Sequence, residues 1–481
     1  MTETSPTVAI AGGGLAGLAA ACALSDVGFR VTLFEKRPYL GGRASSYQHP
    51  GTGEIVDNCQ HVLFRVCSNL VEFYERIGVA DQIRWFDQMN FIEPGGRISV
   101  MKSSFLPAPL HTAPSFLHFP FLSAADKLAI TRALAPLTLT RQADNGQSFQ
   151  QWLERHGQTS NAVARFWRPI LVSALSDELD RISVSAAAQV VRETMKSPLA
   201  RHMGVPALPL TDLYNAAGDY IRAHCGTLHF RTSLEGFTPS PSRVNIRIAS
   251  AEDTERTFDY LVVALPFDAL HRVLPDGAES SPLREKISHF ENSSITGIHL
   301  WFDRQISDLD HAVLLDRTIQ WMFHKSRLQP MRTQLKSIQG AAGATSGSYI
   351  ELVVSSSKTL IEKSRSEIVE LALAEVREFF PAAREANLVK STVIKEVNAT
   401  YSPRPGIDAY RPSSVTVWPR VFLAGDWTAT GWPATMESAV RSGYLAAEAV
   451  ARAAGVRSSD DQPLRFVSPD LAASGLMRLF S

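Results

Sequence analysis

The chain has 481 residues, 45% of them hydrophobic, 20% charged and 9% aromatic, which is the composition of a folded protein with room for about two to four domains. Lys+Arg and Asp+Glu each number 48, so the net charge is zero and the basic surface that nucleic-acid binding needs is not expected. The 4 cysteines show no zinc-ligand or disulfide-scaffold spacing, so no metal site is predicted.

The first 35 residues predict a βαβ unit. Residues 7–11 read as a short buried strand, and residues 12–17 (Gly-Gly-Gly-Leu-Ala-Gly) follow it directly. An alanine-rich helix then runs to about Val27, and the next strand, residues 30–34, ends at Glu35. A G-x-G-x-x-G sequence between a strand and a helix, with an acidic residue near the end of the second strand, is typical of dinucleotide binding.

Each residue of this motif has a physical task. Gly12 permits the tight turn, Gly14 lets the backbone approach a pyrophosphate, and Gly17 allows close packing of the helix on the strand. Glu35 accepts hydrogen bonds from a ribose, and the helix N-terminus favours the anionic phosphates.

A charge-free stretch at residues 103–125 has the length of a membrane span. Its four prolines would break a helix repeatedly in lipid, so a span is not expected. Two interpretations of this stretch remain open: an apolar lid, and a surface patch that touches the bilayer. The N-terminus has no basic region ahead of an apolar stretch, so the cytoplasm is the expected location, with peripheral contact at the inner face of the membrane left open.

Hydrophobic periodicity then predicts the remaining elements. Residues 91–100 read as a hairpin and residues 123–200 as mostly helical. Further strands are expected at residues 244–248, 259–266, 296–302, 349–355 and 421–426. Helices are expected at residues 362–380 and 434–453.

Dinucleotide-type elements thus occur at the start, around residues 225–270 and near the end. We predict an α/β fold in which a discontinuous Rossmann-like domain is interrupted by an α+β substrate domain. The Rossmann-like domain is assigned residues 1–84, 208–290 and 391–453. The substrate domain, a mixed sheet plus helices, takes residues 85–207 and 291–390. Residues 454–481 form a linker and an apolar C-terminal tail.

Two further motifs indicate the cofactor. Gly41-Gly42-Arg43 follows Glu35 closely and offers backbone donors and a guanidinium to an extended diphosphate. Residues 424–437 run from a strand through a polar aromatic loop into a helix, whose N-terminus suits the anionic edge of a reduced flavin.

Together these motifs resemble the flavin amine oxidase / phytoene desaturase superfamily, across nearly the whole chain. Residues 57–61, 405–408 and 423–443 are similar to the squalene-associated FAD-dependent desaturases, also called hydroxysqualene dehydroxylases. Cys59 stands where that family is expected to have glycine.

The resemblance implies roles for individual residues. The diphosphate would be held by Gly12, Gly14, Ala16 and Gly17. Glu35, with the neighbouring Lys36, would hold the adenosine ribose.

The remaining cofactor contacts come from three later segments. Gly42 and Arg43 would flank the diphosphate and ribityl chain, and Leu234, placed in a strand over residues 231–234, would hold the adenine. Gly425 and Asp426 would bind the ribityl or diphosphate region, and Thr435 and Met436 the isoalloxazine. Because residues 424–437 contain no cysteine, the FAD is expected to be non-covalent.

The implied reaction is the reductive removal of the hydroxyl of hydroxysqualene to give squalene, in squalene and hopanoid biosynthesis. It needs an acid that helps water leave and a hydride from reduced FAD. His61 is the first candidate acid, with a flavin-edge contact or plain packing as alternatives. Asp57 is the second candidate acid; its alternatives are capping a turn or holding FAD.

The implied partners are an isoprenoid lipid, a squalene-pathway synthase, the membrane surface and an external electron donor. An external donor is expected because the glycine-rich residues 340–347 lack the flanking strand and helix of a nicotinamide site. One alternative is a phytoene or carotenoid-type desaturase, or another oxidase of this fold, which runs the flavin in the oxidative direction. Another is a non-enzymatic isoprenoid-binding escort protein, against which the intact Glu35, Arg43 and Asp426 argue.

Overall fold

A five-stranded parallel sheet forms the centre of one half of the molecule. The computed structural model describes residues 5–249, 254–329 and 347–480. The strand order is β10-β2-β1-β14-β20, with every neighbouring pair parallel. The strands are β1 (Thr7–Ala11), β2 (Arg30–Glu35), β10 (Thr227–Phe230), β14 (Tyr260–Val263) and β20 (Val421–Leu423).

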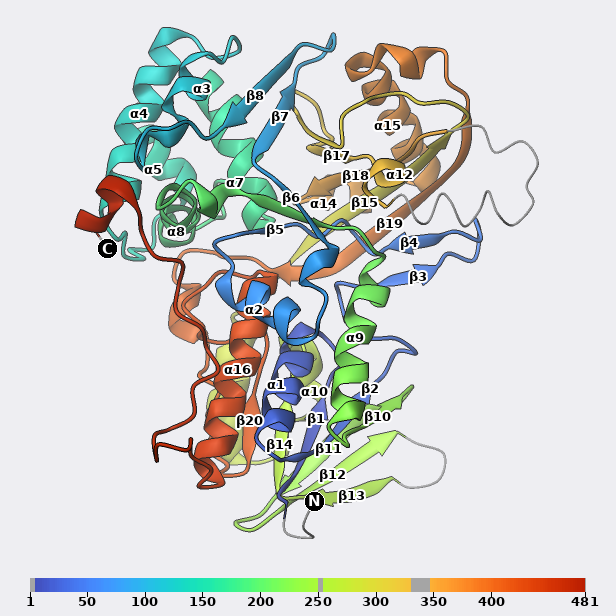
Figure 1. Ribbon diagram of the computed structural model, residues 1–481, viewed down its shortest axis with the longest axis vertical. Coiled ribbons are helices and arrows are strands. Elements are labelled where there is room, and N and C mark those ends of the chain that lie inside the picture. The colour runs from blue at the N-terminus through green and yellow to red at the C-terminus, as the bar shows by residue number, and fades with distance from the viewer. Residues whose placement is uncertain (1–4, 250–253, 330–346, 481) are drawn as a thin grey trace.

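Helix α1 (Leu15–Asp26) is buried between this sheet and two other helices, α9 (Leu210–Ala223) and α16 (Met436–Ala453) (Figure 1). The alanine side chains of α1 are small, so the neighbouring helices can approach it closely. At Gly443 of α16 an added Cβ would lie 2.2 Å from the carbonyl oxygen of Ala16, which only glycine avoids. The predicted βαβ unit at the start of the chain is therefore confirmed.

A three-stranded antiparallel sheet follows β10: β11 (Ser233–Pro239), β12 (Val244–Ala249) and β13 (Glu255–Phe258). The predicted strand over residues 231–234 is wrong. Arg231 has a positive φ of 54° and turns the chain between β10 and β11, so that Leu234 lies near the start of β11. A run of strand-forming residues cannot show where one sheet ends and the next begins.

The other half of the molecule contains a seven-stranded mixed sheet of order β19-β15-β18-β17-β16-β7-β8 (Figure 1). Only the β16–β7 pair is parallel. The strands are β7 (Gln88–Ile92), β8 (Ile98–Lys102), β15 (Asn292–Phe302), β16 (His311–Leu314), β17 (Trp321–Phe323), β18 (Tyr349–Ser355) and β19 (Leu388–Tyr401).

Side-chain alternation gives this sheet two apolar faces. Leu352 packs with α15 (Arg365–Phe379) on one face, and the next residue, Val353, packs with a group of helices on the other. This group, in the predicted helical region, consists of α3 (Ala113–Leu117), α4 (Ala124–Leu139), α5 (Phe149–Arg155), α6 (Ser160–Ala162), α7 (Arg168–Leu175) and α8 (Val184–Met195). The predicted hairpin is the pair β7–β8.

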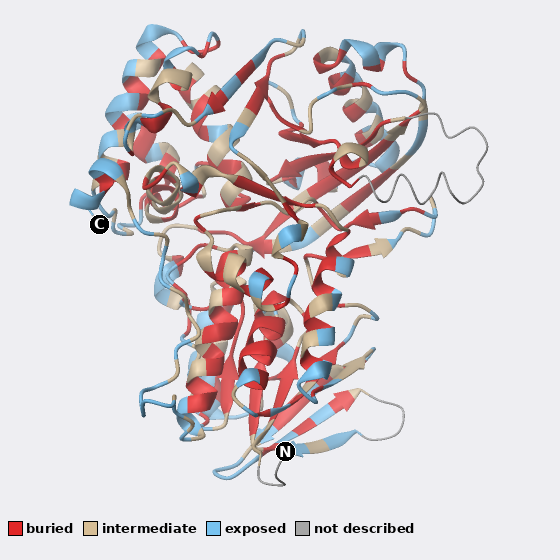
Figure 2. Cartoon of the chain, viewed as in Figure 1, coloured by how far each residue is buried: buried red, intermediate tan, exposed pale blue. Residues whose placement is uncertain are grey.

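Smaller elements connect the two halves. A hairpin-like pair consists of β3 (Ser46–Gln48) and β4 (Ile55–Asp57), and a three-stranded sheet of β5 (Leu63–Phe64), β9 (Met203–Pro206) and β6 (Ile83–Phe86). The remaining helices are α2 (Ser68–Arg76), α10 (Phe267–Val273), α11 (Ser281–Ser288), α12 (Lys325–Leu328) and α14 (Lys358–Ile361). Buried residues fill both halves (Figure 2).

The predicted α/β fold class is confirmed, whereas the domain boundaries stay a prediction. Of the glycine-rich residues 340–347, all but Gly347 lie outside the described residues. Within the described part of the chain, no helix is both long and apolar enough to cross a membrane.

The charge-free stretch at residues 103–125 divides into buried and exposed parts. Phe119 and Phe121 are buried, whereas Phe105 is 96% exposed and Leu117 61%. The C-terminal tail lies against the same stretch, because the Leu476 N–H donates to the Ala108 carbonyl at 2.9 Å.

Candidate functional site

One cavity of about 950 Å³ extends from the glycine-rich loop into the apolar helices. At one end its wall consists of the loop after β1, the end of β2, residues 41–44 and the N-terminus of α16. At the other end it consists of side chains of α4, α7 and α8 and of the stretch at residues 109–116. The cavity therefore joins a polar, glycine-lined part to a largely apolar one.

The polar part is shaped by glycines whose missing Cβ atoms matter. An added Cβ on Gly17 would lie 1.9 Å from the Gly12 carbonyl oxygen, so Gly17 serves packing and does not line the cavity. At Gly42, which has φ 59°, an added Cβ would lie 2.9 Å from the Gly14 Cα. Gly42 therefore permits the close approach of the two backbone segments, and both glycines line the cavity wall.

Helix α1 begins at this point with no side-chain cap. Its N-cap is Gly14, and its first turn carries no acidic residue. The first-turn N–H groups of a helix have no partner within the helix, so they favour an anionic ligand. Gly14 and Ala16 both line the cavity.

Glu35 lies at the end of β2 and is 5% exposed. Its Oε2 accepts from the Gly13 N–H at 2.7 Å and its Oε1 from the Arg37 N–H at 2.8 Å. These bonds fix the carboxylate at the cavity wall, beside Lys36, and each oxygen keeps further acceptor capacity for a ribose hydroxyl.

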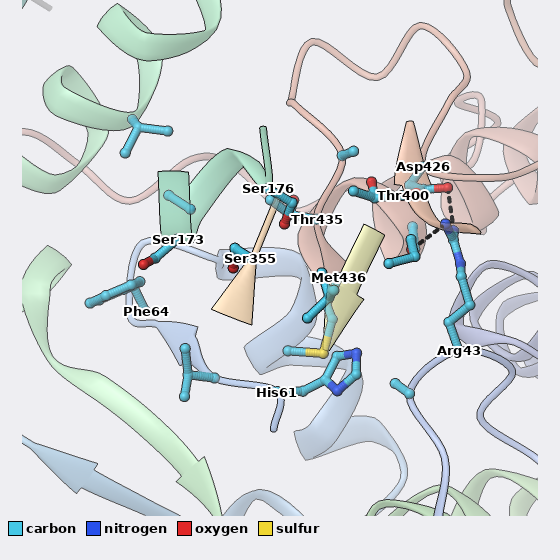
Figure 3. Close-up of a pocket in the computed structure, with 18 of the residues that line it drawn as sticks. Arg43, His61, Phe64, Ser173, Ser176, Ser355, Thr400, Asp426, Thr435 and Met436 are labelled. Carbon is cyan, nitrogen blue, oxygen red and sulfur yellow. Dashed lines mark hydrogen bonds and ion pairs between the residues drawn. The ribbon is translucent and has the colours of Figure 1, made fainter. Parts of the chain in front are cut away.

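Arg43 and Asp426 bring the first and last motifs together (Figure 3). The Arg43 Nη2 lies 2.6 Å from the Asp426 Oδ1, and Nη1 donates to the Ala399 carbonyl at 2.9 Å. Asp426 is 6% exposed, whereas the Arg43 side chain is 33% exposed, so the carboxylate is shielded from solvent and the guanidinium side only in part.

The N-terminus of α16 supplies the remaining predicted contacts. Thr435 is the N-cap, and its side chain accepts from the Ser438 N–H. Thr435, Met436, Gly425 and Leu234 all line the cavity. The predicted cofactor residues therefore gather around one cavity, except Gly17.

These residues fit a flavin dinucleotide. An uncapped helix N-terminus and the Gly14–Gly42 approach suit a diphosphate, and a fixed carboxylate suits a ribose. Cys59 also lines the cavity, and burial raises the pKa of its thiol well above the usual value, so the thiol stays protonated.

His61 lines the cavity, as does Met436 (Figure 3). Its Nδ1 lies 2.7 Å from the Cys59 carbonyl oxygen, which can only accept, so Nδ1 carries the proton. Burial lowers the pKa of His61 below 6.5. The ring is therefore neutral at pH 7, with Nε2 as a proton acceptor.

Asp57 lies outside the cavity wall, in a buried cluster of charges. It forms an ion pair with Lys325 and accepts from the Leu210 N–H at 3.2 Å. The Lys325 Nζ also donates to the Gln60 Oε1 at 2.8 Å and lies 3.4 Å from Glu351. The cluster anchors both ends of residues 57–60 directly before His61, so the geometry supports a positioning role for Asp57.

Sequence reasoning missed three residues of this region. Thr400 on β19 and Arg201 after α8 line the cavity, and Lys325 anchors the segment before His61. None belongs to a local motif, and Lys325 and Asp57 are 268 positions apart. No pattern in the sequence marks them.

Comparisons with known proteins agree with this geometry. The model of the family described as flavin containing amine oxidoreductase matches residues 15–451. A 15-cis-phytoene desaturase from Synechococcus elongatus is 26% identical over 485 residues, covering 97% of this chain and 99% of the relative. A probable zeta-carotene desaturase from the same organism is 27% identical over 488 residues, covering 93% and 99%.

Among solved structures, a putative protoporphyrinogen oxidase from Exiguobacterium superposes with a TM-score of 0.66 at 16% identity, covering 93% of this chain and 99% of that one. This likeness shows the fold alone. Membership of a flavin-containing family, together with the fit described above, makes FAD the cofactor.

Proposed function

The chain belongs to the flavin containing amine oxidoreductase family, and from this premise we propose that it exchanges hydride between FAD and a long acyclic isoprenoid. It is an FAD-dependent oxidoreductase. The substrate class and the direction of the reaction are the proposal.

The proposal is supported by the shape of the cavity. Its polar, glycine-lined part continues without a break into an apolar part between α4, α7 and α8. The walls of that part include Leu134, Phe166, Ile170, Val191 and Met195. A cavity of this volume, with such apolar walls, suits an apolar chain with few functional groups.

Bound FAD supplies hydride transfer at its N5 atom. The chain's own residues orient the reactants, exclude water and handle the proton. His61 is suited to the last task, because it lines the cavity and its neutral ring leaves Nε2 as an acceptor.

The relatives favour desaturation. Their printed names are phytoene and zeta-carotene desaturases, and they match over nearly their whole length. In this direction the substrate loses a hydride and a proton, and a neutral His61 accepts the proton. An external electron acceptor would then reoxidise the flavin.

A second candidate is the reductive dehydroxylation of hydroxysqualene, and Thr400 favours it. Thr400 lines the cavity and is 7% exposed, and its Oγ1 is a buried oxygen with no hydrogen-bond partner among the described residues. Ser173, Ser176 and Ser355 also line this region. A pure hydrocarbon cannot bond such hydroxyls, whereas a hydroxylated polyene can.

The two directions are separated by product analysis. Protein with oxidised FAD and an electron acceptor is incubated with phytoene, and protein with reduced FAD is incubated anaerobically with hydroxysqualene; extracted lipids are then identified by mass. Products with added double bonds support desaturation, and squalene supports dehydroxylation. If neither product forms, the proposed substrate class is wrong.

The Thr400→Val variant refines the second candidate. Its loss of one hydroxyl should raise KM for hydroxysqualene by about tenfold while FAD affinity stays unchanged. If FAD affinity falls instead, Thr400 serves the cofactor. The Thr257→Val variant, at an exposed position of β13 outside the cavity wall, is a control that should change neither value.

A further inference from the structure

Arg201 is a cation on the wall of the cavity, and it has no carboxylate partner among the residues that the structure describes. It ends a short helical turn, Leu199–Arg201, and its Nη1 reaches the Ser103 hydroxyl at 3.5 Å. No ion pair involves Arg201 in the described ranges 5–249, 254–329 and 347–480. By contrast, Arg43 at the other part of the cavity is paired with Asp426.

The surroundings of Arg201 do not neutralise its charge. Burial lowers the pKa of Arg201 to about 10, so the side chain remains protonated at neutral pH. His111, whose pKa Arg201 helps to lower, is fully buried with a pKa of about 4 and is therefore neutral. A buried charge that lacks a counter-charge is costly, and binding an anion would relieve this cost.

The position of Arg201 separates it from the cofactor contacts. Ser103 belongs to the stretch that also contributes Pro109, Leu110 and Phe116 to the cavity wall. Arg43, in contrast, contacts Asp426 and Ala399. A ligand at Arg201 would thus contact both an anion-binding group and apolar walls. Leu110 is exposed, so the part of the cavity near Arg201 extends to the surface.

We propose that Arg201 is an anion-binding subsite for the phosphate of an amphiphile whose apolar chain lies in the cavity. Guanidinium binds phosphate through parallel hydrogen bonds, which makes arginine well suited to this ligand. Two sources offer the chemistry, an isoprenoid diphosphate and the headgroup of a membrane phospholipid. The placement of the ligand's apolar chain in the cavity rests on the proposed function.

The first test compares geranylgeranyl diphosphate with geranylgeraniol, which has the same chain and no charge. Binding to the full-length, FAD-loaded protein is followed by the fluorescence of Trp167 and Trp321, which line the cavity. Wild type should bind the diphosphate at least tenfold more tightly than the alcohol. R201Q should lose this preference and keep its affinity for the alcohol, whereas R201K should keep part of it.

The second test identifies the source of the phosphate. Co-sedimentation with phosphatidylglycerol vesicles is compared with phosphatidylcholine vesicles, for wild type and R201Q. An Arg201-dependent preference for phosphatidylglycerol, without a preference for the diphosphate, assigns the subsite to the lipid headgroup. R132Q removes an exposed arginine of α4 and is the matched control, expected to behave as wild type.

The proposal is overturned if wild type binds the diphosphate no more tightly than the alcohol and R201Q sediments as wild type does. If R201Q does not fold, wild type that prefers neither the diphosphate over the alcohol nor phosphatidylglycerol over phosphatidylcholine overturns the proposal equally. Failure of the alcohol to bind any form of the protein would instead count against the proposed isoprenoid cavity.

Discussion

Arg43 and Asp426 form an ion pair, with 2.6 Å between Nη2 and Oδ1, that joins the first cofactor motif to the last across 383 positions of sequence. The pair links the parallel sheet to the mixed sheet, because Asp426 follows β20 and the Arg43 Nη1 also donates to the Ala399 carbonyl of β19. We therefore expect cofactor binding and the placement of the two halves to be coupled through this guanidinium.

We expect Asp426→Asn and Arg43→Met each to weaken FAD binding by about 1.5–3 kcal/mol, the range for a hydrogen bond to a charged group. The double variant should lose less than the sum, since the two side chains act as a unit. Titration of the apoprotein with FAD, followed by flavin fluorescence, measures all three. Additive losses would mean that the pair is not coupled. Glu178→Gln, in a surface pair with Arg168, should leave FAD affinity unchanged.

Glu35→Ala should weaken FAD binding by about 1–3 kcal/mol, because it removes the acceptor at the ribose position and also the bond from the Gly13 N–H. The same titration measures the change. Glu235→Ala, which removes a half-exposed carboxylate from β11, is the control. Unchanged affinity in Glu35→Ala would refute the ribose assignment.

His61→Gln should keep FAD bound and lower turnover by about 10²-fold or more. Burial lowers the pKa of His61, so the neutral acceptor form is present at pH 7 and is lost as pH falls through a value below 6.5. The pH profile of kcat/KM in wild type should therefore have an acidic limb below 6.5 that the variant lacks. Activity that rises as His61 becomes protonated would identify an acid instead, and an unchanged profile would remove His61 from the mechanism.

Lys325→Met should destabilise the fold by about 3–5 kcal/mol, because it leaves the buried carboxyl groups of Asp57 and Glu351 without their cation. Urea unfolding measures the loss. Turnover of the variant should fall only because the fold is less stable and His61 is less well positioned. FAD affinity should be largely retained. A loss below 1 kcal/mol would show that the cluster does not anchor residues 57–60.

Glu351→Gln is the companion variant. Burial raises the pKa of Glu351 to about 7, although Lys325 opposes the shift. Between its usual value of 4.5 and 7 the folded state thus binds more protons than the unfolded state at this site, and its contribution to stability falls as pH rises. Relative to wild type, Glu351→Gln should therefore gain stability from pH 5 to pH 8. A stability difference between variant and wild type that stays constant across this range would contradict the raised pKa of Glu351.

The sequence predicts what local patterns encode. Gly12, Gly14 and Glu35 lie within one βαβ unit, where the order of glycines and the following carboxylate determines the geometry, and the structure places them around one cavity. The hairpin β7–β8 and helix α15 likewise follow from periodicity over neighbouring residues.

Long-range pairing explains what the sequence does not reveal. Asp57 reads as a candidate acid until Lys325, from a four-residue helix far along the chain, is seen beside it. Thr400 and Arg201 are unremarkable in sequence, and only the cavity makes them candidates. Strands as short as β16 and β17 are stabilised by their neighbours in the sheet, which local propensity does not report.

The most direct test of the central claim is a single-turnover measurement of the flavin itself under anaerobic conditions. Oxidised protein is mixed with phytoene, and reduced protein with hydroxysqualene, while the flavin absorbance is followed. We expect bleaching of the flavin in the first mixture or recovery of the oxidised spectrum in the second, slowed at least about 10²-fold by His61→Gln. A flavin spectrum that neither isoprenoid changes would contradict hydride exchange with this substrate class.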